Sequence, residues 1–126
     1  MRLVATMAIS LVVFLGIGIY SEIWISNTAQ EVSLEVAHLA ETVRNHNWNE
    51  AAKLIDDIHK RWASITDRWD IIVDHSEIDE VNLALIRATK FIETESFELA
   101  LAEIAVIHHM VLHIAEKESL RILNIF

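Results

Sequence analysis

The chain has 126 residues, of which 19 are Asp or Glu and 10 are Lys or Arg, so its formal net charge is −9 at neutral pH. Such an acidic chain repels nucleic acid and anionic lipid headgroups, which excludes a nucleic-acid-binding function and membrane attachment through a basic patch. The absence of Cys excludes disulfides, and the length suffices for one hydrophobic core.

The first predicted element is an apolar helix. Residues 3–20 contain no charged side chain, and at about 1.5 Å rise per residue they span most of a hydrocarbon core of about 30 Å. Tyr20 and Trp24 follow where an aromatic belt is expected, with Glu22 at the level of the lipid headgroups. We therefore predict a transmembrane anchor over residues 1–25.

A cleaved secretory signal is the alternative for this segment. A signal has a shorter apolar region followed by a small-x-small cleavage site, but the best candidate site, Gly16-Ile17-Gly18, lies inside the apolar run. The uncleaved anchor is the favoured interpretation, with a processed secreted protein as a weaker one. Arg2 favours a cytoplasmic amino terminus by the positive-inside rule, which makes residues 26–126 an extracytoplasmic domain at the cell membrane.

Four helical segments follow from the spacing of apolar residues. The first, at residues 26–44, is expected to continue from the anchor because no Gly or Pro interrupts it. The second, at residues 48–73, has apolar residues in strict three-four alternation, and the third begins at a capping box, residues 76–79. The fourth, at residues 97–115, is apolar around most of its circumference, which indicates a central position or one shared with a partner.

Short polar connections between these segments predict antiparallel neighbours. The expected fold is all-α: a transmembrane helix followed by an up-down-up-down four-helix bundle of two helical hairpins. A weak internal repeat supports the two hairpins, since an aromatic, a small and an apolar residue recur at the same spacing, as Trp48, Ala51 and Ile55 and again as Phe97, Ala100 and Ile104. Residues 99–114 are too short for a second membrane span and contain one Glu and three His, so we expect them in the bundle.

His residues suggest a metal site. In the fourth helix His109 and His113 are one turn apart, and Glu116 follows at the next turn. Together with His75 these residues are the candidate ligands for a divalent metal ion. Ligands along a single helix seldom converge on one ion, so a structural role for the His pair is the favoured interpretation, and no other cofactor is predicted.

The bundle topology brings the end of the second helix and the end of the fourth to the same end, nearest the membrane. We expect Asp74 and His75 close to His113 there, although capping of the third helix by Asp74 and Ser76 is the favoured role for these connection residues. The apolar tail, residues 120–126, is expected to cover the base of the bundle, to enter the membrane interface or to contact a membrane partner, in that order of preference. The candidate interaction surface comprises Asp74, His75, Ile125 and Phe126.

No pattern of catalytic residues is present, because the chain has no Cys, no glycine-rich loop and no convincing nucleophile context. We therefore expect a protein that is not an enzyme. The leading hypothesis is an interaction or scaffold module that binds a membrane partner or itself, and the alternative is an extracytoplasmic bundle that senses a ligand or metal.

Several short motifs together resemble a protein family, the domain of unknown function 4363. They are Asn47-Trp48-x-x-Ala51, Asp74-His75-x-Glu77-Ile78-Asp79-Glu80, His113 with Glu116-Lys117-Glu118-Ser119-Leu120, and the ending Asn124-Ile125-Phe126. The likeness covers the whole chain, and the family comprises short bacterial proteins that are sometimes encoded beside small integral membrane proteins. The resemblance implies a membrane-anchored helical protein with a membrane partner, and it supplies no catalytic residues.

Overall fold

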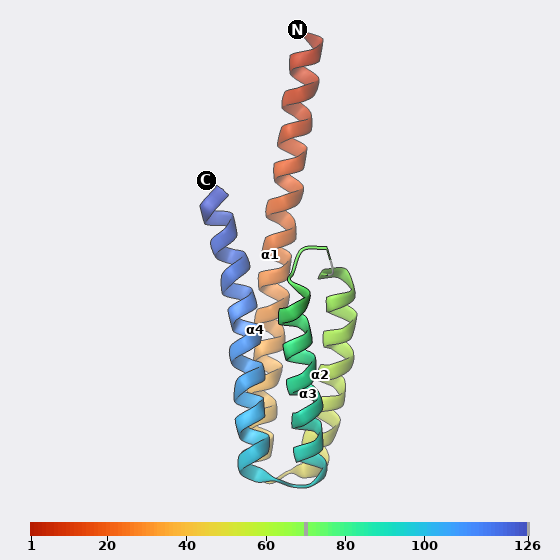
Figure 1. Cartoon of the computed structure of the whole chain (residues 1–126), viewed down its shortest axis with the longest axis vertical. Coiled ribbons are helices and arrows are strands. Elements are labelled where there is room, and N and C mark those ends of the chain that lie inside the picture. The colour runs from red at the N-terminus through yellow and green to blue at the C-terminus, as the bar shows by residue number, and fades with distance from the viewer. Residues whose placement is uncertain (70, 126) are drawn as a thin grey trace.

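The computed structural model describes residues 1–69 and 71–125, without the side chains of residues 122, 123 and 125. It contains four helices, α1 (Arg2–Arg44), α2 (Trp48–Trp69), α3 (His75–Glu93) and α4 (Phe97–Ile125). Helix α1 packs against α2 and α4, and α3 packs against the same two helices, so the four form an up-down-up-down bundle (Figure 1). The predicted all-α bundle of two helical hairpins is confirmed.

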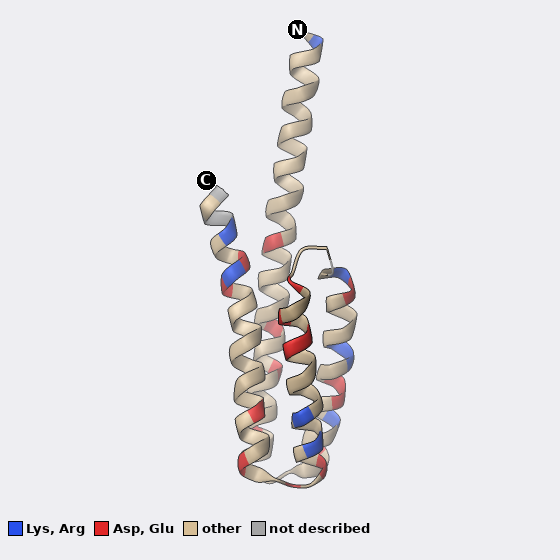
Figure 2. Cartoon of the chain, viewed as in Figure 1, with Lys and Arg blue, Asp and Glu red and all other residues tan. Residues whose placement is uncertain are grey.

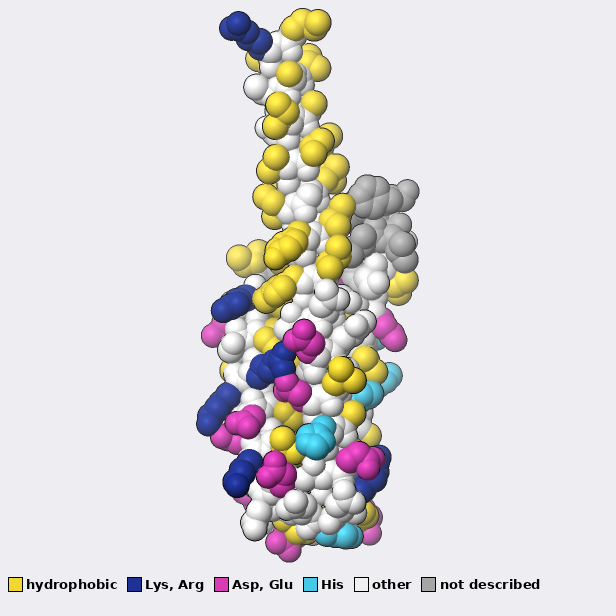
Figure 3. Space-filling view, turned by 180° about the vertical axis from the view of Figure 1, so that it is seen from behind, with side chains coloured by type: hydrophobic (Ala, Val, Ile, Leu, Met, Phe, Trp, Pro, Cys, Tyr) yellow, Lys and Arg dark blue, Asp and Glu magenta, His cyan; other side chains and the backbone are white. Residues whose placement is uncertain are grey.

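Helix α1 is a single helix with two different surroundings. Residues 2–18 are all exposed, and Figure 3 shows this segment as an apolar stem above the bundle. From Ile25 onward one face is buried against the other helices, with Ala29, Val32, Val36, Leu39 and Val43 completing the buried stripe. The expectation that the first bundle helix continues from the apolar segment without a break is correct.

Charge follows the same division along α1. Figure 2 shows Lys, Arg, Asp and Glu distributed over the bundle, whereas the stem carries charge only at its tip until Glu22. Two helices, α1 and α4, are long and apolar enough to cross a membrane, but the α4 stretch is 28% buried inside the structure and the α1 stretch is not buried at all. The stem of α1 is therefore the segment that packing leaves available for a membrane.

Helix α4 is ten residues longer than expected. We predicted an end near Ala115, but the helix continues to Ile125. It extends past the α2–α3 connection and rises beside the stem of α1 (Figure 1). The first-ranked expectation for the apolar tail, that it covers the base of the bundle, is replaced by a helix that projects beyond the bundle.

The two hairpin turns have the same geometry, which supports the internal repeat. His46 and Glu95 occupy equivalent positions and both adopt left-handed backbone conformations, with φ of 56° and 52°. The turns close with equivalent backbone hydrogen bonds, from Asn47 N to Thr42 O and from Ser96 N to Phe91 O. The small residue of each repeat, Ala51 or Ala100, is fully buried, as close approach of two helices requires.

Two tryptophans of α2 form the centre of the core. Trp62 and Trp69 are both fully buried, and their rings meet edge to face with centroids 5.4 Å apart and an interplanar angle of 85°. Aromatic pairs favour this arrangement, because the ring edge is positive and the ring face negative. The pair is packed core rather than the wall of a ligand site.

Candidate interaction site

The end of the bundle from which the α1 stem emerges, called the exit end here, gathers several of the predicted site residues. It consists of the α2–α3 connection (residues 71–74), the first turn of α3 and α4 from His113 onward. Lys117 of α4 donates a 2.7 Å hydrogen bond to Glu77 of α3, so the start of α3 and the last turns of α4 are in direct contact. The expected meeting of these two segments at one end of the bundle is correct.

Asp74 is the N-cap of α3. Its carboxylate accepts hydrogen bonds from the backbone N of Ser76 at 2.9 Å and from its hydroxyl at 2.8 Å. The cap therefore precedes the predicted capping box, because Asp74 occupies the N-cap position that the box gives to Ser76, and the Ser76 hydroxyl itself donates to Asp74. The hydrogen bonds from Ser76, with a smaller contribution from nearby Lys117, lower the pKa of Asp74.

Loss of this cap gives a first testable prediction. Asp74→Ala should lower the Tm by roughly 4–8 °C at neutral pH, as measured by circular dichroism in detergent micelles. Because the folded pKa of Asp74 is lowered, its contribution is present above the unfolded value of 3.8 and is lost as the pH falls through the folded value. The difference between variant and wild type should therefore shrink in acid.

Asp57→Ala is the matched control for this cap variant. Asp57 is an exposed acid in the interior of α2, and its removal should leave the Tm almost unchanged. An Asp74→Ala protein that melts at the wild-type temperature would show that the cap contributes nothing to the stability of the bundle.

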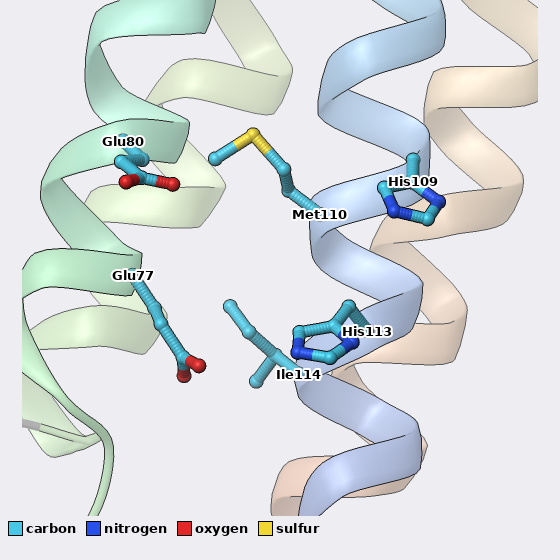
Figure 4. A pocket seen from close by; sticks show the side chains of 6 residues that line it. All are labelled: Glu77, Glu80, His109, Met110, His113 and Ile114. Atoms are coloured by element: carbon cyan, nitrogen blue, oxygen red, sulfur yellow. The ribbon is translucent and has the colours of Figure 1, made fainter.

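The predicted His ligands lie partly together. The rings of His109 and His113 stack with centroids 6.5 Å apart, and both residues line a pocket of about 250 Å³ between α3 and α4. Glu77 faces His113 across this pocket, and Glu80 lies one turn further along α3 (Figure 4).

The remaining candidate ligands lie outside this pocket. Glu116 is exposed and lines a groove between α1 and α4, and His75 is the exposed first residue of α3. Among the residues that the structure describes, no three His, Asp or Glu side chains are grouped closely enough to hold a metal ion. The structure thus brings His109 and His113 together but does not assemble the four predicted ligands.

Glu118 is a buried acid that the sequence analysis missed. Only 1% of this residue is exposed, and its Oε2 atom has no hydrogen-bond partner within the described part of the chain. Arg121 lies 3.3 Å from its other oxygen. Burial raises the pKa of Glu118 because the charged form is poorly solvated, although Arg121 opposes this effect.

A second acid faces Glu118 from α1. The negative charge of Glu22 further raises the pKa of Glu118, and the Oε2 atom of Glu22 is also buried without a partner among the described residues. Two carboxyl groups, each with a buried oxygen, thus lie close enough to repel each other across α1 and α4 at the base of the stem. Such a contact is costly when both groups are charged.

The last part of the exit end is apolar and exposed. Ile71, in the α2–α3 connection, is 96% exposed, and Leu120, in the last turns of α4, is 57% exposed. Asp74 and His75 lie beside this connection, whereas the side chain of Ile125 and all of Phe126 lie outside the described residues. The predicted interaction surface remains a prediction, and Ile71 is an exposed apolar residue of the exit end that it did not include.

A family model described as Domain of unknown function (DUF4363) matches residues 19–125. The chain belongs to this family. The DUF4363 match contains the complete exit end together with Glu22 of α1, and it carries no assigned activity. No curated protein and no solved structure matches the chain.

The buried acid of this DUF4363 protein gives a second prediction. Because the folded pKa of Glu118 is raised, the folded state retains a proton that the unfolded chain releases near pH 4.5. The resulting stabilisation is full below that pH and is lost as the pH rises through the folded pKa. Between pH 4 and 8, the Tm of wild type should therefore fall relative to that of Glu118→Gln, which cannot titrate at this position.

The neighbouring Glu116→Gln variant controls for this titration, because Glu116 is exposed on the same helix. It shows how far loss of one exposed carboxyl group from this helix changes the Tm at each pH. A difference between wild type and Glu118→Gln that stays constant would contradict a raised pKa at Glu118.

Proposed function

We propose that this protein is a membrane-anchored interaction module without enzymatic activity, whose bundle binds a membrane protein or a second copy of the chain. The observation that carries this proposal is the continuity of α1, which joins an exposed apolar stem to a helix buried in the bundle. Because α1 has no break between stem and bundle, a membrane around the stem would hold the exit end at its surface. The stem is long enough for a bilayer crossing, and Arg2 favours a cytoplasmic amino terminus and an extracytoplasmic bundle.

An apolar face over α3 and α4 supports a protein partner. Arg87 of α3 pairs with Glu103 of α4 at 2.9 Å, which joins the two helices on their outer side. Leu83 lies one turn from Arg87, and Leu99 and Val106 lie one turn on either side of Glu103. These three apolar residues are 54%, 53% and 41% exposed. Exposed apolar side chains gathered on one face are typical of a protein–protein interaction site.

Cross-linking from this face tests the proposal. The chain has no native Cys, so Val106→Cys introduces a single reactive thiol in the full-length protein. In native membranes, a photo-cross-linker that carries a maleimide for the thiol and a benzophenone that inserts into nearby C–H bonds should join Val106→Cys to one partner of discrete mass, either another membrane protein or a second copy of the chain. The matched Ala52→Cys variant has its thiol on an exposed position of α2 and should remain uncross-linked.

Two results would contradict the interaction module. One is a lone monomer from both variants in native membranes, together with a monomeric mass after mild detergent extraction. The other is equal cross-linking from Val106→Cys and Ala52→Cys, which would show that the α3–α4 face has no preference for a partner.

A ligand- or metal-sensing bundle is the second candidate, and the pocket between α3 and α4 favours it. This pocket is lined by two carboxylates and the stacked pair His109 and His113, residue types that bind divalent cations. The described side chains are not grouped closely enough to hold an ion as they stand, so a bound cation would have to draw them together. Metal analysis of the purified protein and thermal melts before and after a chelator test this candidate. A bound ion whose removal lowers the Tm, but not in His109→Ala or His113→Ala, would support sensing; no ion and no shift would eliminate it.

A further inference from the structure

The last turns of α4 lie at a fixed height relative to the α1 stem. Glu118 of α4 interacts electrostatically with Glu22 of α1, and Ser26 and Gln30 line one groove together with residues 115–120. The two helices are antiparallel, so α4 rises as α1 is followed back toward its amino terminus (Figure 1). Glu22 and Glu118 therefore mark approximately the same level in the molecule.

Beyond this level α4 continues for about seven residues. At about 1.5 Å rise per residue, residues 119–125 add roughly 10 Å of helix. Counted back from Glu22 and from the groove at Ser26 and Gln30, they reach about the level of residues 15–20 of α1, within the stem. The end of α4 is thus beside the segment that we propose to cross the membrane.

With the stem anchored in the membrane as proposed, its length determines whether this end of α4 lies in lipid or in water. A membrane-spanning helix needs about 20 apolar residues, and the stem offers little more than that between Leu3 and Trp24. Withdrawing the end of α4 into water would also withdraw about seven stem residues, because α1 is unbroken. The rest of the stem, about 15 residues or roughly 22 Å long, would be too short for a hydrocarbon core of about 30 Å.

The composition of the tail agrees with a lipid environment. After Glu118 the described residues contain no acid, and Leu120, Ile122, Leu123 and Ile125 are apolar. The only charged residue is Arg121, whose side chain is 54% exposed and long enough to reach back to lipid phosphates. Its cation complements anionic headgroups, which the acidic surface of the rest of the bundle would repel.

We propose that the last two turns of α4, residues 119–125, are embedded beside α1 in the lipid leaflet nearer the bundle. The occupant of this surface is lipid, with Arg121 at the headgroups and the exposed Leu120 among the acyl chains. The protein would then contact the bilayer through a complete span and a shallow second helix end. This arrangement holds the bundle upright and limits its rotation on the stem.

Depth-dependent fluorescence quenching in the full-length protein tests this inference, which rests on the proposed membrane anchoring. Single cysteines are introduced by Leu120→Cys or Asn124→Cys at exposed positions of the tail, labelled with an environment-sensitive fluorophore and reconstituted in phosphatidylethanolamine–phosphatidylglycerol vesicles. Val12→Cys reports the stem and Ala52→Cys reports the bundle surface. Circular dichroism of each labelled protein verifies that the helices are retained.

Embedding of the tail predicts blue-shifted emission at positions 120 and 124, with quenching by spin-labelled lipid chains that is stronger at 124. Position 12 should also be quenched by lipid, and position 52 only by aqueous iodide. Iodide quenching at 120 and 124 with lipid quenching retained at 12 would overturn the inference while leaving the anchor intact. Lipid quenching absent at 12 as well would overturn the anchor. Protection of 124 from both quenchers would indicate a protein partner in place of lipid.

Discussion

Replacing both Leu11 and Val12 by Arg should move the protein from the membrane fraction to the soluble fraction. Both residues lie in the exposed stem of α1, and a charged residue near the centre of a spanning helix costs about 2.5–3.5 kcal/mol on insertion scales. The two substitutions together should cost roughly 5–7 kcal/mol, enough to change partitioning by several powers of ten. Extraction of membranes with alkaline carbonate measures the distribution.

A bundle variant with the same added charge is the control. Leu34→Arg combined with Ala52→Arg places two Arg residues at exposed positions of α1 and α2 within the bundle, so this protein should remain in the membrane pellet. Retention of the Leu11→Arg, Val12→Arg protein in the pellet would show that the stem is not the anchor. The anchor would then have to be α4, the other described helix that is long and apolar enough to span a membrane.

Trp62→Ala should lower the free energy of unfolding by about 3–5 kcal/mol. Trp62 is completely buried at the centre of the bundle and packs edge to face against Trp69. Truncation removes the largest type of side chain and leaves a cavity that the surrounding helices cannot fill completely. Urea unfolding in detergent micelles, followed by the fluorescence of the remaining tryptophans, measures the loss.

Two further variants separate packing from other effects. Trp62→Phe should cost much less than Trp62→Ala, because it keeps an aromatic ring and removes an indole Nε1 that has no partner within the described chain. Leu34→Ala removes an exposed side chain and should change the free energy of unfolding by less than about 0.5 kcal/mol. Equal effects of Trp62→Ala and Leu34→Ala would contradict the assignment of Trp62 to the core.

Local sequence patterns predicted the hairpins well. The three-four alternation of α2 and the short polar connections reflect packing within one helix and chain reversal over a few residues, so neighbouring residues carry the signal. The repeated positions of Ala51 and Ala100 predicted the equivalent helix approaches that the structure contains. The buried positions and the geometry of the turns could therefore largely be predicted from the sequence.

The end of α4 was predicted poorly, because charge near residues 116–118 resembles the end of an amphipathic helix. In the structure Glu118 continues the buried stripe of Ile107, Val111 and Ile114 at helical spacing. The local pattern does not show that α1 would cover this acid or that Glu22 would lie opposite it. The burial of Glu118 could have been predicted by extending the buried stripe by one more turn.

The sequence predicted the positions of some candidate site residues better than others, for the same reason. Capping acts over two residues, so the role of Asp74 was accessible from the sequence even though the cap begins earlier than the predicted box. The relation among His75, His113 and Glu116 depends on the rotation of α3 and α4 about their axes, which the apolar periodicity specifies only approximately. His113 stacks on His109 because the two lie one turn apart on α4, whereas the rotation of the helices leaves His75 and Glu116 apart from the pocket.

The central claim is that one unbroken helix fixes the exit end of the bundle at the membrane surface. The most direct test is energy transfer from a donor on Ile71→Cys or on Asn49→Cys to acceptors attached to lipid headgroups in reconstituted vesicles. The two positions lie near opposite ends of α2, about 30 Å apart along the helix. We expect strong transfer from position 71 and weak transfer from position 49. Equal transfer from both positions, or stronger transfer from position 49, would contradict the claim.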